Sequence, residues 1–193
     1  MAEAINPIQE VNIEKTPFEG LLIIRPDVFG DDRGWFFESF SEARFRIETG
    51  MNLTFVQDNE SMSKKGVIRG LHFQVSPKAQ AKLIRVSRGS VLDVVVDLRR
   101  TQPTYGRHFS VVLSAHEHNQ LFVPEGFAHG FAVLEDDTLF TYKCSNYYSR
   151  EHERALRWND PALRIDWGVD DPILSSRDRE APLLADLPQD LFF

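Results

Sequence analysis

The sequence predicts an all-β protein, either a sandwich or a barrel, and two observations carry this prediction. Turn signals recur along the chain, and the segments between them are short and rich in Val, Ile, Leu and Phe. Residues 92–98 (LDVVVDL) alternate between two faces, as a strand with one core side requires, and Asp93 falls on the face opposite Leu92. We therefore expect Asp93 to point into a cavity.

The remaining elements are expected around these strands. Residues 41–49 (SEARFRIET) predict a short helix outside the sheets, with Ser41 as N-cap and Gly50 just past its end. No internal repeat or long linker divides the chain, so residues 1–193 are expected to form a single domain. Residues 1–17 are expected to be peripheral, and the Pro- and Asp-rich tail 161–193 is expected to wrap around the barrel.

Composition narrows the class of protein. The formal net charge of -7 argues against a nucleic-acid partner, which usually needs a basic face. Cys144 is the only cysteine, so an intrachain disulfide or a thiolate zinc cluster cannot form, as suits a reducing cytosol. No signal-peptide core and no run approaching ~18 apolar residues is present. We expect a cytoplasmic protein with no membrane partner.

Two clusters carry candidate chemistry. Residues 66–89 place His72, Lys82 and Arg69 on adjacent apolar runs, where an imidazole can take a proton and an ammonium can hold the charge left behind. Residues 124–131 (PEGFAHGF) place His129 between turn-forming glycines. Each residue taken alone also fits a structural role: a hydrogen-bonded core histidine, an edge-strand lysine or a packed turn histidine.

The same clusters follow the outline of the two motifs of cupin barrels, with Gly66 six positions before His72 and His129 in the second motif. The second ligand of the usual HxH pair is replaced by Gln74, and Lys82 stands where a metal-binding cupin has its glutamate. Because a cation there would repel a divalent metal, we expect the barrel without a metal site.

Several longer segments resemble the dTDP-4-dehydrorhamnose 3,5-epimerase family, from about residue 18 to residue 182: FGDDRGWFFESF, FVQDNESMSKKGVIRGLHFQ, AKLIRVSRGSVLDVVVDLR, PTYG, LFVPEGFAHGF, TYKCSNYY, RWNDPALRIDW and LSSRD. The resemblance implies a cupin-type double-stranded β-helix, a jelly-roll barrel with short peripheral helices. It also implies an enzyme without metal or cofactor that inverts C3 and C5 of a dTDP-4-keto-6-deoxyhexose on the route to dTDP-L-rhamnose.

The resemblance implies roles for four catalytic residues. His72 is the base, and Asp178 is its carboxylate partner, which fixes the tautomer and stabilises the imidazolium. Lys82 stabilises the enolate oxygen. Tyr142 returns a proton from the opposite face, because return from His72 would restore the original configuration.

The remaining site residues are also implied by the resemblance. Nine residues are expected to bind substrate: Arg69, His129 and Asp93 at the sugar, Gln57, Asn59 and Arg33 at the phosphates or nucleotide, Glu38 and Phe29 at the base from a neighbouring subunit, and Tyr148 stacked on it. This arrangement implies a homodimer with an exchanged N-terminal strand. The departures are modest, and Arg177 stands where relatives often have lysine.

Three alternatives remain open. A sister enzyme of the same fold could epimerise only C5 or only C3 of a dTDP-4-keto-deoxysugar in another pathway, and the shared motifs do not separate it from a 3,5-epimerase. A noncatalytic cupin that binds a nucleotide sugar is disfavoured by the presence of His72, Lys82, Tyr142 and Asp178. A metal-dependent cupin oxygenase is disfavoured by Gln74 and Lys82.

Overall fold

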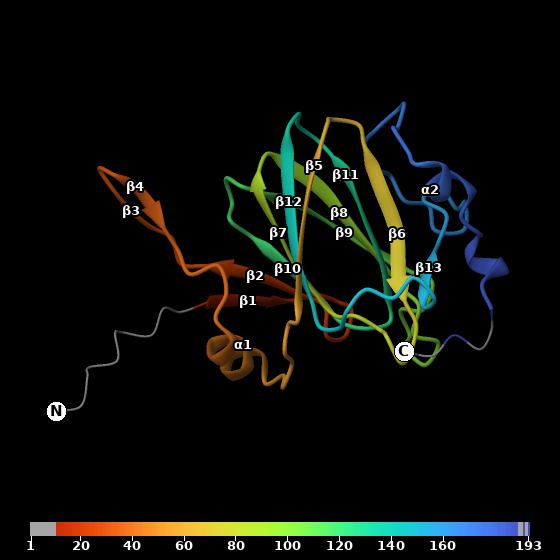
Figure 1. Ribbon diagram of the computed structural model, residues 1–193, viewed down its shortest axis with the longest axis horizontal. Coiled ribbons are helices and arrows are strands. Elements are labelled where there is room, and N and C mark those ends of the chain that lie inside the picture. Colours follow the sequence, from red (N-terminus) through yellow and green to blue (C-terminus); the bar gives the residue numbers. More distant parts are fainter. Residues whose placement is uncertain (1–10, 189–190, 192) are drawn as a thin grey trace.

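The computed structural model describes residues 11–188, 191 and 193, and these form two antiparallel sheets that face each other (Figure 1). The six-stranded sheet has the order β1 (Val11–Lys15), β2 (Leu22–Pro26), β10 (Gln120–Val123), β7 (Lys82–Arg88), β12 (Thr138–Cys144) and β5 (Gln57–Ser63). The five-stranded sheet has the order β13 (Glu153–Ala155), β6 (Ile68–Gln74), β11 (Phe127–Val133), β8 (Ser90–Asp97) and β9 (His108–Ser114). The all-β prediction is confirmed.

The main core lies between the two sheets, because every strand that crosses it buries alternate side chains there. Ile84 and Phe140 contribute from the six-stranded sheet, and Val95 and Phe131 contribute from the five-stranded sheet. The rings of Phe131 and Phe140 stack across the gap at 3.9 Å between centroids. This contact holds the sheets together directly beside the region where polar side chains begin.

The predicted early helix is α1 (Glu42–Thr49). The Ser41 side chain accepts a hydrogen bond from the Arg44 backbone N–H, and Gly50 ends the helix in the left-handed region at φ 69°. Phe45 packs on Phe122 of β10 at 5.2 Å between ring centroids, within a cluster on the outer face of the six-stranded sheet. The helix therefore lies outside the sheets, as predicted.

The C-terminal part of the chain covers the outer face of the five-stranded sheet, where Leu163 and Trp167 pack against Leu71 and Val94. It contains α2 (Ser176–Glu180) and the short helix η1 (Leu184–Asp186), beside β6 and β13 in Figure 1. At the other end of the chain, residues 11–15 form an edge strand paired with β2, and residues 1–10 lie outside the described residues. None of the described helices is long and apolar enough to cross a membrane.

A small hairpin, β3 (Phe29–Asp31) and β4 (Gly34–Phe36), projects away from both sheets as an arm (Figure 1). Its aromatic side chains Trp35 and Phe36 are 63% and 66% exposed. The base of the arm rests on His118, whose ring lies 4.5 Å from Trp35.

Two glycines allow β6 and β11 to approach closely. A Cβ on Gly70, which has φ 124°, would lie 2.5 Å from the Cα of Gly130, and a Cβ on Gly130 would lie 2.7 Å from the Arg69 carbonyl oxygen. The close approach sets the register in which His72 lies directly opposite His129. The glycines thereby bring together the two histidines that the sequence singled out.

Candidate active site

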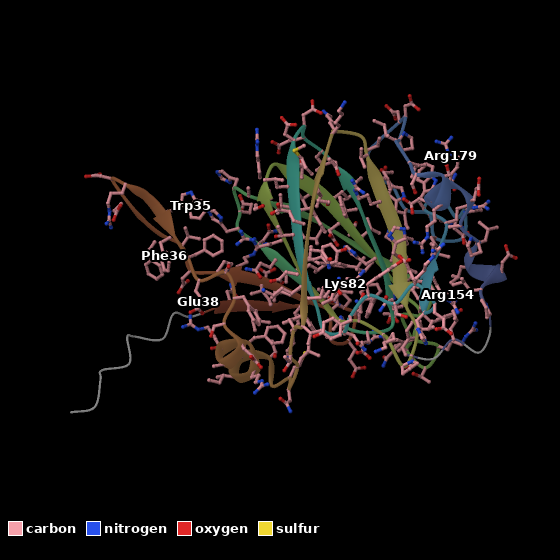
Figure 2. All side chains as sticks on the ribbon, viewed as in Figure 1. Trp35, Phe36, Glu38, Lys82, Arg154 and Arg179 are labelled. Atoms are coloured by element: carbon pink, nitrogen blue, oxygen red, sulfur yellow. The ribbon has the colours of Figure 1, made fainter. Side chains whose placement is uncertain are left out.

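A pocket of about 300 Å³ opens between the two sheets, beside the main core. Its walls contain eleven side chains: Gln57, Asn59, His72, Phe73, Gln74, Gln80, Lys82, Tyr142, Cys144, Tyr148 and Glu153. Three of the four residues predicted to be catalytic are among them, and they come from both sheets. Figure 2 labels Lys82 in the middle of the molecule, between the strands of the two sheets.

The fourth predicted catalytic residue, Asp178, lies behind His72. The Nε2 atom of His72 is 2.5 Å from Oδ1 of Asp178, whose side chain is 5% exposed. Burial acts to raise the pKa of Asp178, but hydrogen bonds from His72 and Ser175 outweigh it and lower the pKa. Because an ionised carboxylate only accepts hydrogen bonds, Nε2 carries the hydrogen, and Nδ1 keeps a free lone pair.

Lys82 and Tyr142 face this dyad from the six-stranded sheet. The Nζ atom of Lys82 lies 5.7 Å from the centroid of the Tyr142 ring. Burial lowers the pKa of Lys82 and raises the pKa of Tyr142. Neither Nζ nor the phenol oxygen has a hydrogen-bond partner within residues 11–188, so both groups remain available to a ligand in the pocket.

His129 and Asp93 form a second imidazole–carboxylate pair deeper between the sheets. Nε2 of His129 lies 2.9 Å from one carboxylate oxygen of Asp93 and 3.1 Å from the other. Both side chains are buried, and burial lowers the pKa of His129 and raises that of Asp93. The contact expected between Asp93 and His129 is present, and His129 lies directly opposite His72 in the pairing of β11 with β6.

Amide side chains organise the opening of the pocket. Gln57 donates to Asn59 Oδ1 at 2.9 Å and accepts from the Tyr148 backbone N–H at 2.9 Å. Asn59 donates in turn to the Cys144 sulfur at 3.6 Å. Gln74 donates to the Lys78 carbonyl oxygen at 2.6 Å and is buried. The predicted binding residues Gln57, Asn59 and Tyr148 therefore lie together at one side of the pocket.

Sequence reasoning missed Glu153, which lines the pocket from β13. Tyr148 Oη and Arg177 Nη1 both donate to its Oε2 atom, at 2.8 Å and 2.6 Å. The pairing of β13 with β6 places Glu153 opposite Gln74. No local motif marks this residue, because its position depends on the pairing of a three-residue strand with a strand about eighty positions earlier in the chain.

Four predicted binding residues lie elsewhere. Arg33 and Phe29 are on the arm, where Arg33 pairs with Asp31, and Glu38 lies 3.4 Å from Arg44 near α1. Arg69, near the start of β6 and before His72, donates to Ser63 at 3.1 Å. The chain by itself does not bring Arg33, Phe29 or Glu38 to the pocket.

The pocket was also compared with the ligand requirements of a metal ion. Within the part of the chain that the structure describes, no three His, Cys, Asp or Glu side chains are grouped as ligands for a metal ion. Lys82 lines the same pocket as His72, and Gln74, two positions after His72 on β6, is occupied by backbone hydrogen bonds. The polar groups that line the pocket are one imidazole, several amides, two phenols, one ammonium, the Cys144 thiol and the Glu153 carboxylate, which is already paired with Arg177.

Comparison with known proteins decides the family. The family model described as dTDP-4-dehydrorhamnose 3,5-epimerase matches residues 15–186. This chain belongs to that family. The dTDP-4-dehydrorhamnose 3,5-epimerase of Shigella flexneri is 49% identical over 168 residues, which are 87% of this chain and 93% of that protein.

Solved structures of the epimerase family share the fold. A crystal structure of dTDP-6-deoxy-D-glucose-3,5-epimerase from Legionella pneumophila, in complex with dTDP-4-keto-L-rhamnose, matches with a TM-score of 0.91 and 44% identity over 95% of this chain and 97% of that chain. A 3'-monoepimerase from Streptomyces bikiniensis, in complex with dTDP-quinovose, matches with a TM-score of 0.84 and 36% identity over 88% and 86% of the two chains. The predicted cupin-type fold is confirmed, in the form of two facing sheets.

Proposed function

We propose that this protein epimerises dTDP-4-dehydro-6-deoxy-D-glucose at C3 and C5 to dTDP-4-dehydro-L-rhamnose, a step in dTDP-L-rhamnose biosynthesis. The observation that carries the proposal is the opposition of groups across one pocket. The His72–Asp178 dyad lies on the five-stranded sheet, and Lys82 and Tyr142 lie on the six-stranded sheet. An inversion needs a proton acceptor and a proton donor on opposite faces of the sugar.

His72 takes the proton in this proposal. A hydrogen on a carbon next to the C4 ketone is acidic because the resulting enolate carries its charge on oxygen. Nδ1 of His72 accepts the proton, and the electrons of the broken C–H bond remain on the substrate as the enolate. The ionised Asp178 behind Nε2 stabilises the imidazolium that forms. The same base serves C3 and C5, since both carbons flank the ketone.

Lys82 holds the enolate oxygen, and Tyr142 returns the proton. Burial of Lys82 strengthens the hydrogen bond that its amino group donates to a developing oxyanion. The raised pKa of Tyr142 keeps the phenol protonated at neutral pH, as a proton donor must be. The proton arrives from the six-stranded sheet, so the configuration at carbon is inverted.

The remaining substrate contacts extend this assignment. Asp93 orients His129 beside the sugar with Arg69, and Gln57, Asn59 and Tyr148 hold the phosphates and the base. Arg33, Phe29 and Glu38 lie away from the pocket of their own chain. We assign them to the pocket of a second subunit, in a homodimer with an exchanged N-terminal strand. The chain is assigned as one cytoplasmic domain that acts without metal or cofactor.

Deuterium exchange tests the proposed function. The purified, chelator-treated protein is incubated in heavy water with dTDP-4-keto-6-deoxyglucose, and NMR follows deuterium at C3 and C5 separately. We expect exchange at both carbons, and reduction of the product by a dTDP-4-dehydrorhamnose reductase to dTDP-L-rhamnose. Absence of exchange at both carbons would contradict an epimerase and favour a noncatalytic sugar-nucleotide binder.

A mono-epimerase is the second candidate, because the fold of the Streptomyces bikiniensis 3'-monoepimerase matches over most of this chain. The same catalytic groups serve one carbon or two, and the difference lies in whether the sugar ring can present C3 and C5 in turn to His72. Exchange at only one carbon in the same experiment would select this candidate.

A further inference from the structure

A continuous chain of side chains connects the opening of the pocket to the dyad. Tyr148 Oη and Arg177 Nη1 donate to the same oxygen of Glu153, at 2.8 Å and 2.6 Å. Arg177 immediately precedes Asp178 in α2, and Asp178 accepts from His72 at 2.5 Å. A residue at the opening and the proposed base are thus joined through two hydrogen bonds, one ion pair and one peptide unit.

The helix that carries Asp178 depends on such contacts. With only five residues, α2 is too short to be stable by itself, so its position is set by what it touches. Ser175 caps its first turn by accepting from the Asp178 N–H at 3.1 Å, and Arg157 holds its end through the Ala181 carbonyl oxygen at 2.8 Å. The side that faces the pocket is held by the Arg177–Glu153 pair.

The charges along this chain reinforce one another. Burial acts to raise the pKa of Glu153, but hydrogen bonds from Arg177 and Tyr148 outweigh it and lower the pKa, so the carboxylate stays ionised. The hydrogen bond to Glu153 raises the pKa of Tyr148, which therefore remains a donor. Such charge-assisted hydrogen bonds are shorter and stronger than neutral ones.

We propose that Glu153 and Arg177 are positioning residues that fix α2, so that Asp178 holds the His72 imidazole at the angle needed for proton transfer. Because Glu153 accepts hydrogen bonds from both Tyr148 and Arg177, the same carboxylate positions the ring on which a nucleotide base would stack and the helix that carries Asp178. The inference rests on the proposed function, in which His72 is the base. Small misplacement of a catalytic group is costly, at about 100-fold in rate for ~1 Å.

The kinetic test compares two arginines of the same helix. Arg177→Met removes the ion pair, and Arg179→Met is the matched control. Arg179 lies at the outer edge of the molecule in Figure 2, and its side chain makes no hydrogen bond or ion pair within residues 11–188. We expect Arg177→Met to lower kcat for deuterium exchange about tenfold, as for a base that is displaced but not deleted.

Further readouts separate positioning from simple binding. For Arg177→Met, KM and the Kd for dTDP should stay within about threefold of the wild-type values, and Arg177→Lys should recover most of kcat, since an ammonium can also pair with Glu153. Arg179→Met should stay within about twofold throughout. An unchanged kcat with raised KM and raised Kd for dTDP would overturn the inference, because Arg177 would then only hold the nucleotide.

A spectroscopic readout does not need activity. The N–H of an imidazole bonded to a carboxylate gives a low-field proton NMR signal, which Asp178→Asn would assign by abolishing it. We expect Arg177→Met and the nearly isosteric Glu153→Gln to shift or broaden this signal, and Arg179→Met to leave it in place. A response of the signal in a protein without exchange activity would keep the link and refute the proposed function. If the protein is active and the imidazole N–H signal is unchanged in both Arg177→Met and Glu153→Gln, the proposed positioning of the dyad by Glu153 and Arg177 is refuted.

Discussion

On the five-stranded sheet two imidazoles, His72 in the pocket wall and His129 deeper between the sheets, are hydrogen-bonded to carboxylates. On the six-stranded wall the Lys82 ammonium and the Tyr142 phenol have no hydrogen-bond partner in the part of the chain that the structure describes. A paired imidazole is held in one tautomer and one orientation, and its partner stabilises the positive charge gained with a proton. An unpaired donor keeps its hydrogen-bonding capacity for the ligand. The first arrangement suits accepting a proton, and the second suits donating one.

Burial separates the two walls further. On the six-stranded wall it lowers the pKa of Lys82 and raises that of Tyr142, which moves both groups toward their neutral forms. On the other wall hydrogen bonds outweigh burial at Asp178 and keep that carboxylate ionised. Hydrogen bonds therefore keep a negative charge behind the proposed base, while burial keeps the phenol opposite it protonated. This asymmetry gives the proton a direction across the pocket.

The largest effect is expected when the base of the five-stranded wall is removed. His72→Asn should lower deuterium exchange at C3 and C5 by about 10³-fold, within the range of positioned acid–base groups. The variant should still fold, which its melting temperature checks, although the buried Asp178 carboxylate loses the hydrogen bond from His72. NMR in heavy water measures both carbons. Wild-type exchange in this variant would assign the base to another residue, and His129 would be the next candidate.

Removing the donor of the opposite wall should separate two steps that His72→Asn abolishes together. Tyr142→Phe deletes one oxygen that has no hydrogen-bond partner within residues 11–188, so the fold should be unaffected. Product formation should fall about 10²-fold, while proton exchange at the substrate carbons falls less, since His72 can still remove and return a proton on its own face. Equal losses of exchange and product would mean that proton removal and proton return are not assigned to separate walls of the pocket.

Local signals in the sequence predicted much of the fold. The Ser41 cap and Gly50 delimit α1, and the alternation of residues 92–98 gives the strand β8 with Asp93 turned inward. Such signals can be found in a single sequence because helix capping and strand alternation depend on residues only a few positions apart. The prediction of Asp178 as the partner of His72 came from the family resemblance, since about a hundred residues separate the two.

The parts that sequence reasoning could not place depend on distant pairing. Glu153 reaches the pocket only because β13 adds to the edge of β6. Arg33 and Phe29 were predicted to bind substrate, yet they lie on an arm directed away from the sheets. Their motif is local, but in the proposed homodimer its binding site lies on a second chain, which no spacing within one chain encodes.

A third prediction sharpens the contrast within the five-stranded sheet itself. The carboxylate of Asp97 pairs with Arg99 at 2.7 Å and accepts from Thr104 at 2.6 Å. Burial acts to raise the pKa of Asp97, but these hydrogen bonds lower it, whereas the pKa of Asp93 on the same strand is raised. A lowered pKa in the folded state adds stability above the unfolded value of about 4, and this stability is lost as the pH falls through the folded pKa.

Asp97→Asn should therefore cost about 1.5–3 kcal/mol of unfolding free energy at pH 7, the range for hydrogen bonds to charged groups. The cost should shrink as the pH falls below about 4 and through the lowered pKa of Asp97, because wild-type Asp97 then becomes protonated as well. Urea unfolding at pH 7 and at the lowest pH at which the protein stays folded measures both values. An identical cost at the two pH values would show that the charge of Asp97 contributes nothing.

The smallest effect is expected at Cys144, which lies opposite Lys82 on the six-stranded wall of the pocket. We expect this residue to line the pocket without a catalytic role. Burial raises the pKa of its thiol, so the reactive thiolate is scarce at neutral pH. Cys144→Ala should leave kcat within about twofold, because surface and lining changes away from reacting atoms usually cost little. The native thiol should react with a chromogenic disulfide far more slowly than the unfolded thiol. Rapid modification of the native protein, or a large loss of kcat in Cys144→Ala, would place a nucleophile on the wall to which we assign only donors.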